Sequence, residues 1–302
     1  MKWTKEEENI LKECYKLSNG VEKAYKIFNT RSKETVRQKA YKMGIKNMNF
    51  YKNENFFEIP NITNSSVAGM IASDGHLNYR KNRYQVDIYQ KTADEEILNQ
   101  IKVVTYSNYN IYRKIEKGGR IIGKNKKPII KDSYGSILYF CKAEKWCQDL
   151  NKNWNIPIGH KSYTLEGPKN LNDLDNKLAY ICGIISGDGS IGISKNKFGG
   201  ILHISIWGTF SLLQWCKNTF SEYLKRELKM DLYKEEESKS CYCLKINSFN
   251  AIQLFEKMRS FNCIKLKRKW DNPKILDLIE NKKKSMKYQK RIERFLVAQS
   301  SN

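Results

Sequence analysis

The chain has 302 residues, 40% of them hydrophobic, and its 55 Lys and Arg residues outnumber 32 Asp and Glu residues to give a formal net charge of +23. This length and apolar content are enough for packed cores, which argues against a disordered chain. The large positive charge favours a polyanionic partner, with nucleic acid as the first candidate. A membrane surface fits poorly, because the sequence has neither an apolar run of about 18 residues nor a basic amphipathic helix with a clean apolar face.

The eight cysteines and three histidines are too scattered for the common metal and catalytic sites. No Cys-x-x-Cys pair is matched by a second pair or by histidines, so we expect reduced thiols and no zinc site. His76, His160 and His203 are too few for a multi-histidine metal site or a Ser-His-Asp triad. The charged N-terminal residues lack the apolar core of a secretory signal, which predicts an intracellular protein, in a prokaryotic or phage-infected cytoplasm or in an organelle.

Residues 1–48 are predicted to form a domain of three short helices. Thr4 and Glu7 match a capping box at the start of the first helix, and Gly44 follows the third helix, residues 32–43. A polar turn before the last helix is typical of a helix-turn-helix unit. The third helix carries side chains that can reach phosphates and base edges in a major groove, namely Lys33, Arg37, Gln38, Lys39 and Lys42.

The opening Trp-Thr-x-Glu-Glu and the later Arg-Ser-x-x-x-Val of this domain resemble Myb/SANT-like helix-turn-helix modules. The resemblance implies binding to duplex DNA. Twelve basic and six acidic residues among the first 50 agree with that role. The alternative is a plain three-helix bundle whose charges form only a solvated face.

After a linker at residues 49–62, the chain contains an internal repeat. From Val67 it reads Val-Ala-Gly-Met-Ile-Ala-Ser-Asp-Gly-His-Leu, and from Ile181 it reads Ile-Cys-Gly-Ile-Ile-Ser-Gly-Asp-Gly-Ser-Ile. Both copies introduce the same predicted order of elements, α-β-β-α-β-β-α, over residues 63–168 and 169–280. The sequence therefore predicts an α+β fold of two pseudo-twofold repeats, acting as a monomer on an approximately palindromic substrate.

Hydrophobic periodicity places the elements that follow each motif. In the first repeat we expect a strand at 85–90, a helix at 94–104, strands at 111–115 and 129–131, and a helix at 137–150. In the second repeat we expect a strand at 201–207, a helix at 210–228, strands at 232–234 and 242–246, and a helix at 249–260. The basic tail, residues 281–302, is expected to form a helix that supports or extends the contact with the partner.

In each copy of the motif, small residues fall four positions apart: Gly69 with Ser73, and Gly183 with Gly187. Small residues at this spacing allow two helix backbones to approach closely. We therefore expect the two motif helices to pack on each other with their C-terminal ends together. This packing would bring Asp74 beside Asp188.

An aspartate at a helix C-terminus faces the negative end of the helix dipole, and a second carboxylate adds repulsion unless a cation is bound. Carboxylates without histidine or thiolate nearby indicate Mg²⁺, which can activate water and stabilise a pentacovalent phosphate. The glycines that follow, Gly75 and Gly189, are expected to take the left-handed conformation that ends each helix. A lone Asp-Gly is usually only a helix stop or a turn, but its repetition in the same context favours function.

The paired motif resembles the LAGLIDADG homing endonucleases in their two-repeat monomeric form, over residues from about 63 to 275. The resemblance implies saddle-shaped antiparallel sheets, with the catalytic Mg²⁺ bound by Asp74 and Asp188. It also implies that Ca²⁺ supports binding without cleavage. Ala72 and Ser186 replace an earlier aspartate of the motif, at a position that varies in the family and is not a metal ligand.

The resemblance implies two further kinds of catalytic residue. Gln90, in Tyr89-Gln-Lys-Thr, matches a glutamine that positions water or phosphate near the metal, whereas the second repeat reads Ile206-Trp-Gly-Thr and lacks it. This difference predicts inequivalent half-sites and unequal cutting of the two strands. A lysine after the third helix of a repeat polarises water or stabilises charge; Lys267 fits this place and Lys161 is a looser match, and either lysine could instead contact phosphate.

In such a fold the strands lie along the major groove, and their outward residues contact DNA. The candidates are Arg80, Arg83, Gln85, Asp87 and Tyr89 in the first repeat and Lys195, Lys197, His203 and Ser205 in the second. The segment Glu116–Lys127 is expected to be a loop that orders on phosphates, with a solvated loop unrelated to DNA as the alternative.

These inferences predict a Mg²⁺-dependent, sequence-specific endonuclease that hydrolyses both strands of a long pseudo-palindromic DNA site. The alternatives with the same fold are an intron RNA-splicing maturase and a regulator that binds DNA without cutting it. Two mutually repelling aspartates argue against a pure regulator. The helix-turn-helix domain favours duplex DNA, because the major groove of A-form RNA is too narrow for a helix.

Overall fold

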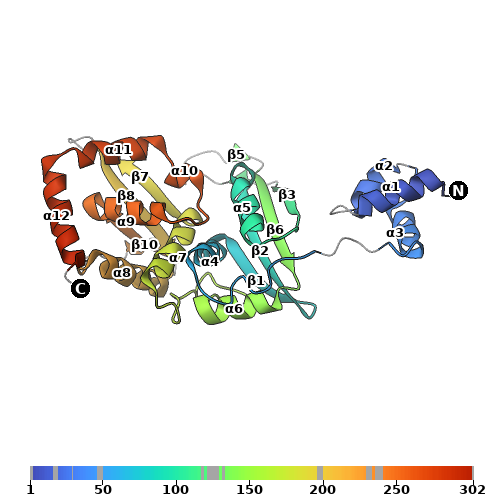
Figure 1. Cartoon of the computed structure of the whole chain (residues 1–302), viewed down its shortest axis with the longest axis horizontal. Coiled ribbons are helices and arrows are strands. Elements are labelled where there is room, and N and C mark those ends of the chain that lie inside the picture. The colour runs from blue at the N-terminus through green and yellow to red at the C-terminus, as the bar shows by residue number, and fades with distance from the viewer. Residues whose placement is uncertain are drawn as a thin grey trace. The chain divides into compact units, whose positions relative to one another are not determined.

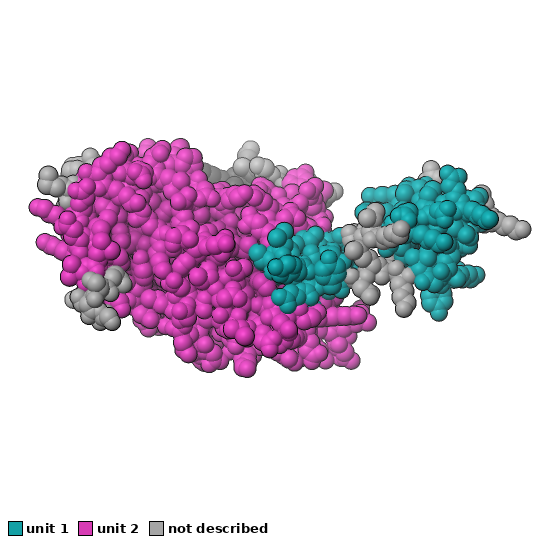
Figure 2. Space-filling model, viewed as in Figure 1, with its two compact units in different colours: residues 1–53, 102–110 teal, residues 54–101, 111–302 magenta. Residues whose placement is uncertain are grey.

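The structure is a computed structural model that describes residues 3–15, 20–28, 30–45, 50–116, 119–120, 129–130, 133–195, 200–228, 233–234 and 241–300. It divides into two compact units (Figure 2), one of residues 1–53 with 102–110 and the other of residues 54–101 with 111–302. The predicted α+β class is confirmed, because the larger unit combines helices with two antiparallel four-stranded sheets. Within the described ranges, no helix is both long and apolar enough to cross a bilayer.

The smaller unit contains helices α1 (Lys5–Tyr15), α2 (Gly20–Ile27) and α3 (Lys33–Lys42). The capping box predicted for α1 is present, since the Thr4 amide donates to the Glu7 carboxylate at 2.9 Å and the Glu7 amide donates to the Thr4 hydroxyl at 3.1 Å. Gly44 follows α3 with a φ of +64°, the left-handed conformation expected of a residue that ends a helix. These local signals explain why this short segment forms three separate helices.

The core of the smaller unit is closed by a buried arginine. Leu11, Ala24 and Val36 pack at its centre. Arg31 is only 7% exposed; it donates to both oxygens of Glu7 at 2.9 Å, and its guanidinium lies 4.0 Å from the centroid of the Trp3 ring. This arginine therefore has a structural role despite its place in the turn before α3.

The larger unit consists of two halves with the same order of elements (Figure 1). The first half contains α4 (Ile62–Asp74), β1 (Gly75–Arg80), β2 (Arg83–Lys91), α5 (Glu96–Val104), β3 (Ile111–Glu116), β6 (Ser133–Cys141) and α6 (Glu144–Trp154). The second half contains α7 (Leu174–Ser186), β7 (Gly189–Ser194), β8 (Ile201–Gly208), α8 (Phe210–Leu224), β9 (Tyr233–Lys234), β10 (Tyr242–Asn247) and α9 (Ser248–Ser260). The sheet orders, β1-β2-β6-β3 and β7-β8-β10-β9, are equivalent.

Several short elements lie outside this repeated pattern. A 3-10 turn, η1 (Thr92–Asp94), precedes α5, and β4 (Gly119–Arg120) pairs with β5 (Ile129–Ile130) in a separate hairpin. Three helices follow α9, namely α10 (Lys267–Trp270), α11 (Pro273–Lys283) and α12 (Met286–Ser300). The expected helix in the basic tail is therefore present as α12.

One pair of predicted elements in the first half is wrong. We expected a helix at 137–150 and a strand at 129–131 paired with the strand at 111–115, but β3 pairs with β6 at Ser133–Cys141 and the helix begins at Glu144. Leu138 and Phe140 are buried while the residues between them are only partly covered, which is the alternation of a strand. The apolar run was too short to distinguish a helix from a strand by sequence.

Each sheet has a face packed against helices and an open face. In β2, Val86, Ile88 and Gln90 are buried beneath α4 and α6, whereas the residues between them lie on the opposite face and are partly exposed. The second sheet repeats this arrangement, with Leu202, Ile204 and Ile206 of β8 on the helical side. The open faces therefore present alternate polar residues, as a half-buried antiparallel sheet requires.

Candidate active site

Helices α4 and α7 approach so closely that glycine is required at their contact. A Cβ atom on Gly69 would lie 2.0 Å from the Tyr180 carbonyl oxygen, and one on Gly183 would lie 2.1 Å from the Ser66 carbonyl oxygen. Neither position can accept a side chain without separating the backbones. The two glycines therefore fix the distance between the helices.

The same contact continues to the C-terminal ends of the two helices. A Cβ atom on Gly187 would lie 2.0 Å from the Ser73 hydroxyl oxygen and 2.7 Å from Oδ2 of Asp74. Asp74 is the last residue of α4, and Asp188 follows Gly187 in the turn after α7. The packing thus brings the two aspartates, one from each half, to a shared site.

The surroundings of the aspartates disfavour their ionised forms. Burial raises the pKa of Asp74, and the charge of Asp188 raises it further. Burial also raises the pKa of Asp188. Other interactions act in the opposite direction. Nε2 of Gln90 donates to Oδ2 of Asp74 at 2.6 Å and lowers the pKa of that carboxyl, and the charges of Lys269 and Lys161 also lower it. Gln90 also fixes the orientation of the Asp74 carboxylate.

The glycines after the aspartates do not have the conformation that we predicted. Gly75 is extended, with φ −102° and ψ 175°, and neither Gly75 nor Gly189 is among the described glycines with positive φ. A Cβ atom on Gly75 would lie 2.6 Å from Cα of Ile71, and one on Gly189 would lie 2.5 Å from Cα of Ile185. Each strand begins directly against the last turn of its helix, so these glycines provide space and not a left-handed turn.

Lys161 binds the carbonyl groups at the end of α4. Its ammonium group donates to the carbonyl oxygens of Ile71 at 2.8 Å, of Ser73 at 2.6 Å and of Ala72. An ammonium group has three N–H donors, so these carbonyl groups occupy all of them. Burial lowers the pKa of Lys161 to about 8, while Asp188 and Asp74 act to raise it.

Lys269 has the equivalent place at the end of α7. Only 8% exposed, it donates to four carbonyl oxygens, those of Ile185 at 3.0 Å, Ser186 at 2.7 Å, Gly187 at 2.7 Å and Gly189 at 2.8 Å. Burial and the nearby Arg268 lower its pKa to about 8. In both halves, a positive charge therefore compensates the negative end of a helix that leads to an aspartate.

The structure places Lys267, the lysine that we favoured from sequence, away from the aspartates. Lys267 is exposed and pairs with Glu96 of α5, while Lys269 occupies the position that matches Lys161. A direct alignment of the two repeats would have identified Lys269. Lys161 and Lys269 follow two apolar residues at the same spacing, in Ile156-x-Ile158-x-x-Lys161 and Ile264-x-Leu266-x-x-Lys269.

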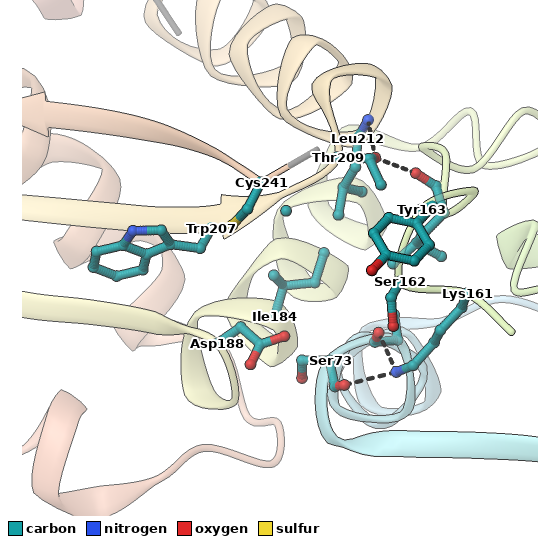
Figure 3. Close-up of a pocket in the computed structure, with 13 residues that line it drawn as sticks. Ser73, Lys161, Ser162, Tyr163, Ile184, Asp188, Trp207, Thr209, Leu212 and Cys241 are labelled. Carbon is teal, nitrogen blue, oxygen red and sulfur yellow. Dashed lines mark hydrogen bonds between the residues drawn. The ribbon is translucent and has the colours of Figure 1, made fainter. Parts of the chain in front are cut away.

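The two halves differ beside their aspartates. Gly75 pairs with Ile88 and Gly189 with Ile206, so the position of Gln90 in the first half corresponds to Gly208 in the second. A pocket of about 370 Å³ lies beside Asp188; Gly208, Trp207 and Tyr163 are among its lining residues. Figure 3 shows the Asp188 carboxylate at this pocket and the Lys161 ammonium directed at the end of α4. In the second half, the place that corresponds to the Gln90 side chain is therefore open space.

The predicted DNA contacts on the sheets have varied surroundings. Arg80 and Arg83 are exposed at the β1–β2 turn, and Lys195 is exposed after β7. Three residues are partly exposed on the open faces, namely Gln85, Tyr89 and His203. Asp87 accepts a hydrogen bond from Asn78 at 3.0 Å, and Ser205 is buried. Lys197 and most of the predicted loop Glu116–Lys127 lie outside the described residues.

The His203 ring is partly enclosed by its own sheet. It covers Gly192, where a Cβ atom would lie 2.8 Å from its Nε2, and its Nδ1 lies 3.1 Å from the Ser194 hydroxyl oxygen. Burial lowers the pKa of His203, which favours the neutral imidazole. A neutral ring on the open face can donate or accept a hydrogen bond, but it adds no positive charge.

On α3 the candidate contacts divide into exposed and bound side chains. Arg37, Gln38 and Lys42 are exposed, whereas Lys33 is half-buried and Lys39 donates to Glu8 at 2.5 Å. Sequence reasoning missed Tyr41, which is 86% exposed on this helix. An exposed aromatic side chain among basic residues is the signal that could have identified it.

No protein-family model and no curated protein matches this chain in sequence. The solved structures to which it is similar include several LAGLIDADG homing endonucleases. I-LtrWI bound to target DNA is 12% identical, with 80% of this chain and 97% of that chain covered and a TM-score of 0.44. I-SmaMI bound to cleaved DNA is 12% identical, with 78% and 96% covered and a TM-score of 0.43. I-GzeII in complex with its DNA target is 13% identical, with 78% and 97% covered and a TM-score of 0.42.

Proposed function

We propose that this chain is a Mg²⁺-dependent, sequence-specific DNA endonuclease that cuts both strands of a long pseudo-palindromic site. The observation that carries the proposal is the pair of aspartates at equivalent ends of two glycine-packed helices, with Asp74 half-buried and Asp188 exposed at the pocket beside it. Carboxylates that have a raised pKa and meet at a symmetric contact are typical of a functional site. Structural stability alone would be better satisfied by neutral residues at this place.

The donor set of this site fits Mg²⁺. Within the described ranges, no group of three His, Cys, Asp or Glu side chains forms a ligand cluster, so a cage made only of protein side chains is absent there. Mg²⁺ commonly binds one or two carboxylates together with waters and substrate phosphates. Asp74 and Asp188 supply such oxygens. A bound divalent ion would supply an activated water and stabilise negative charge on the phosphate.

The chain's own residues hold the carboxylates in place. Gln90 binds one oxygen of Asp74 and leaves the other available for a ligand. Lys161 binds carbonyl groups at the end of α4, and Lys269 binds carbonyl groups at the end of α7 and the start of β7. These contacts use all of their N–H donors, so neither lysine has a donor left for water. We therefore assign the lysines the role of positioning the helix ends and compensating charge, instead of polarising water as the sequence resemblance implied.

The open faces of the two sheets suit a duplex that carries two similar half-sites. The major groove of B-DNA admits a two-stranded β-ribbon, and β1 with β2 and β7 with β8 each present alternate polar residues on the open face. We propose that Arg80, Arg83, Gln85 and Tyr89 contact one half-site and that Lys195, Lys197 and His203 contact the other.

The test is to incubate the purified chain with a randomised duplex DNA library in Mg²⁺ and, separately, in Ca²⁺, and to sequence the cut ends and the retained DNA. Discrete ends formed only with Mg²⁺, at a site that is also retained in Ca²⁺, are the expected result. Sequences that are retained but never cut would contradict the endonuclease and favour a regulator or an intron RNA-splicing maturase.

We also propose that the smaller unit extends the recognised sequence through the exposed face of α3. Deletion of residues 1–48 leaves the segment that follows anchored, because the Tyr51 amide donates to the Asn108 side chain at 2.8 Å and the Asn53 amide donates to the Thr105 carbonyl at 2.8 Å. The truncated chain should cut with Mg²⁺ at a shortened footprint. A folded truncation without metal-dependent cutting would overturn this division of roles.

A further inference from the structure

A basic pocket of about 430 Å³ lies where α12 crosses the start of α9 and the end of α8. Four basic residues line it, Lys225 and Arg226 after α8 and Arg291 and Arg294 on α12. None of its described lining residues is acidic. Such a concentration of positive charge in a concave site favours an anionic ligand.

The arginines of this pocket are available to a ligand. Among the described residues, neither Arg226 nor Arg294 makes an ion pair, and both side chains are exposed. The Arg291 guanidinium lies 5.9 Å from the centroid of the Phe249 ring, a contact that orients it without neutralising its charge. Guanidinium groups bind phosphate oxygens in pairs and are weakly hydrated, so these side chains suit a phosphate group.

The backbone at the start of α9 adds to this positive environment. Asn247 is the N-cap residue of this 13-residue helix, and its side chain makes no capping hydrogen bond. The first amide groups of the helix are therefore not satisfied by a side-chain cap. Because Ser248, Phe249 and Asn250 line the pocket, the helix N-terminus complements the arginines in binding an anion.

Aromatic contacts hold α12 in the position that forms the pocket. The ring centroids of Phe249 and Tyr288 are 5.2 Å apart, and those of Tyr223 and Phe295 are 5.8 Å apart. Nε2 of Gln253 donates to the buried Tyr288 hydroxyl at 2.9 Å. The pocket is therefore part of a packed structure, and its arginines extend from a fixed helix.

The pocket lies at the end of the second sheet that is distant from the aspartates. Tyr242 pairs with Gly208 beside the Asp188 pocket, whereas Asn247 pairs with His203. Five strand residues correspond to roughly 17 Å at about 3.3 Å per residue. Asn247 and His203 share the open face of the sheet, and Figure 1 shows α12 at the end of the second half that is farther from α4 and α7. The basic pocket therefore lies at the outer end of this sheet, where Asn247 belongs to the open face and the other lining residues belong to α8, the turn after it, α9 and α12.

We propose that this basic pocket binds a backbone phosphate of duplex DNA at the outer end of the half-site that contacts β7, β8 and β10. The inference rests on the proposed function, which places the duplex on the open sheet faces. It assigns the basic C-terminal helix a direct role in DNA binding, in addition to its packing against α8 and α9.

The test compares the full chain with the double variant Arg291→Gln/Arg294→Gln and with the control Lys284→Gln/Lys290→Gln. The control removes the same charge from exposed residues of the same C-terminal segment that do not line the pocket. Binding of uncut duplex is measured in Ca²⁺ over a range of salt concentrations. We expect the arginine variant to reduce the salt slope by about 0.9, the contribution of one lost phosphate contact, and the control to leave it unchanged.

Phosphate ethylation interference on the bound duplex locates the contact. For the full chain and the control, we expect interference at phosphates near one outer end of the site, and its loss in the arginine variant. Equal slopes and equal interference patterns in all three proteins would overturn the proposal. Thermal unfolding of each protein verifies that the variants are folded; if the arginine variant is unfolded, Arg226→Gln replaces it in the same assays.

A second measurement separates a DNA phosphate from a free phosphate ligand. The thermal midpoint of each protein is measured in inorganic phosphate and in chloride of equal ionic strength. Stabilisation by phosphate that requires the arginines, together with an unchanged DNA salt slope, would assign the pocket to a small phosphate compound and overturn the DNA contact. If the full chain cuts no DNA yet the slopes differ as expected, the endonuclease proposal fails while the pocket assignment stands.

Discussion

The two halves of the larger unit share one backbone plan but differ in what surrounds their aspartates. Both have a glycine at the helix contact, a strand that begins against the helix end and a buried lysine that binds the last carbonyl groups. Beside Asp74 the first half has the amide of Gln90, whereas beside Asp188 the second half has Gly208 and an open pocket. The symmetry therefore resides in the groups that position the carboxylates, and the asymmetry resides in the groups next to them.

This comparison separates two tasks that the sequence motif combines. The glycines and lysines determine where the aspartates lie, and both halves retain them. The residue on the second strand differs between the halves: Gln90 orients the Asp74 carboxylate, whereas Gly208 leaves space beside Asp188. In the proposed endonuclease, the two DNA strands would therefore meet equally placed carboxylates with different neighbouring groups.

The largest effect is expected from Asp74→Asn and Asp188→Asn. Each variant should reduce double-strand cleavage by roughly a thousandfold or more, because loss of a metal ligand removes several kcal/mol of transition-state stabilisation. DNA binding in Ca²⁺ should be largely retained. Cleavage of strand-labelled duplex with Mg²⁺ is the measurement. Undiminished cutting by the double variant would refute the site, and efficient nicking of one strand by either single variant would show that the halves act independently.

The lysines should differ in their contribution to stability. Replacement by Met leaves three carbonyl groups without their partner at Lys161 and four at Lys269. We expect each variant to lower the free energy of unfolding by about 2 to 4 kcal/mol, with the larger loss at the more buried Lys269. Urea denaturation measures the loss.

Lys267→Met is the matched control for the lysine variants. This exposed residue pairs at the surface with Glu96, so its replacement should leave the free energy of unfolding almost unchanged. Cleavage by Lys267→Met should also remain near that of the unchanged chain. A strong catalytic defect in this variant, with normal activity in Lys269→Met, would restore the assignment that we made from sequence.

Substitution of the glycine at the helix contact should destabilise the protein by a similar amount in the two halves. Gly69→Ala and Gly183→Ala each place a methyl group about 2 Å from a backbone carbonyl oxygen, and we expect losses of about 2 kcal/mol or more in the free energy of unfolding. Gly208→Ala is the control, since its Cβ would meet only side-chain atoms, the end of Leu212 at 3.2 Å and the end of Leu213 at 3.8 Å. Similar losses at all three glycines, measured by denaturation, would contradict the close helix contact.

The smallest effect is expected from exchange of the residues that differ between the halves. Gly208→Gln places an amide group in the pocket beside Asp188, and Gln90→Gly removes the amide that binds Asp74. We expect each variant to change the ratio of the two strand-cutting rates by about tenfold, in opposite directions, which corresponds to about 1.4 kcal/mol. Time courses of each labelled strand provide the ratio. An unchanged ratio in both variants would show that this position does not cause the asymmetry.

Much of the fold was predictable because the repeat occurs twice. The order of elements in both halves follows from periodicity, and it agrees with the structure except around β6, where a short apolar run fits either a strand or a helix. The close packing of α4 and α7 follows from small residues four positions apart, since that spacing is a local property of the chain.

The lysines and the glycines after the aspartates were harder to predict. Lys267, Arg268 and Lys269 are adjacent in sequence, and only the turn of α10 determines which of them points to the end of α7 and which to the surface. Asp-Gly is typical of a left-handed helix end. At Gly75, however, the backbone is extended, and glycine is required because β1 begins too close to α4 to leave room for a side chain. The glycine outcome depends on a tertiary contact that no local pattern contains, whereas the lysine could have been identified by aligning the two repeats.

The junction between α4 and β1 has a mechanical consequence. The helix ends at Asp74 and the strand begins at Gly75, with no intervening residue to absorb a displacement. A tilt of β1 therefore moves the Asp74 carboxylate together with the strand. If the open faces hold a duplex as proposed, a poorly fitting base pair far from the centre alters the spacing of the two carboxylates directly. A mismatch at an outer position of the DNA site would then reduce cleavage by displacing the carboxylate, and no loop would have to move.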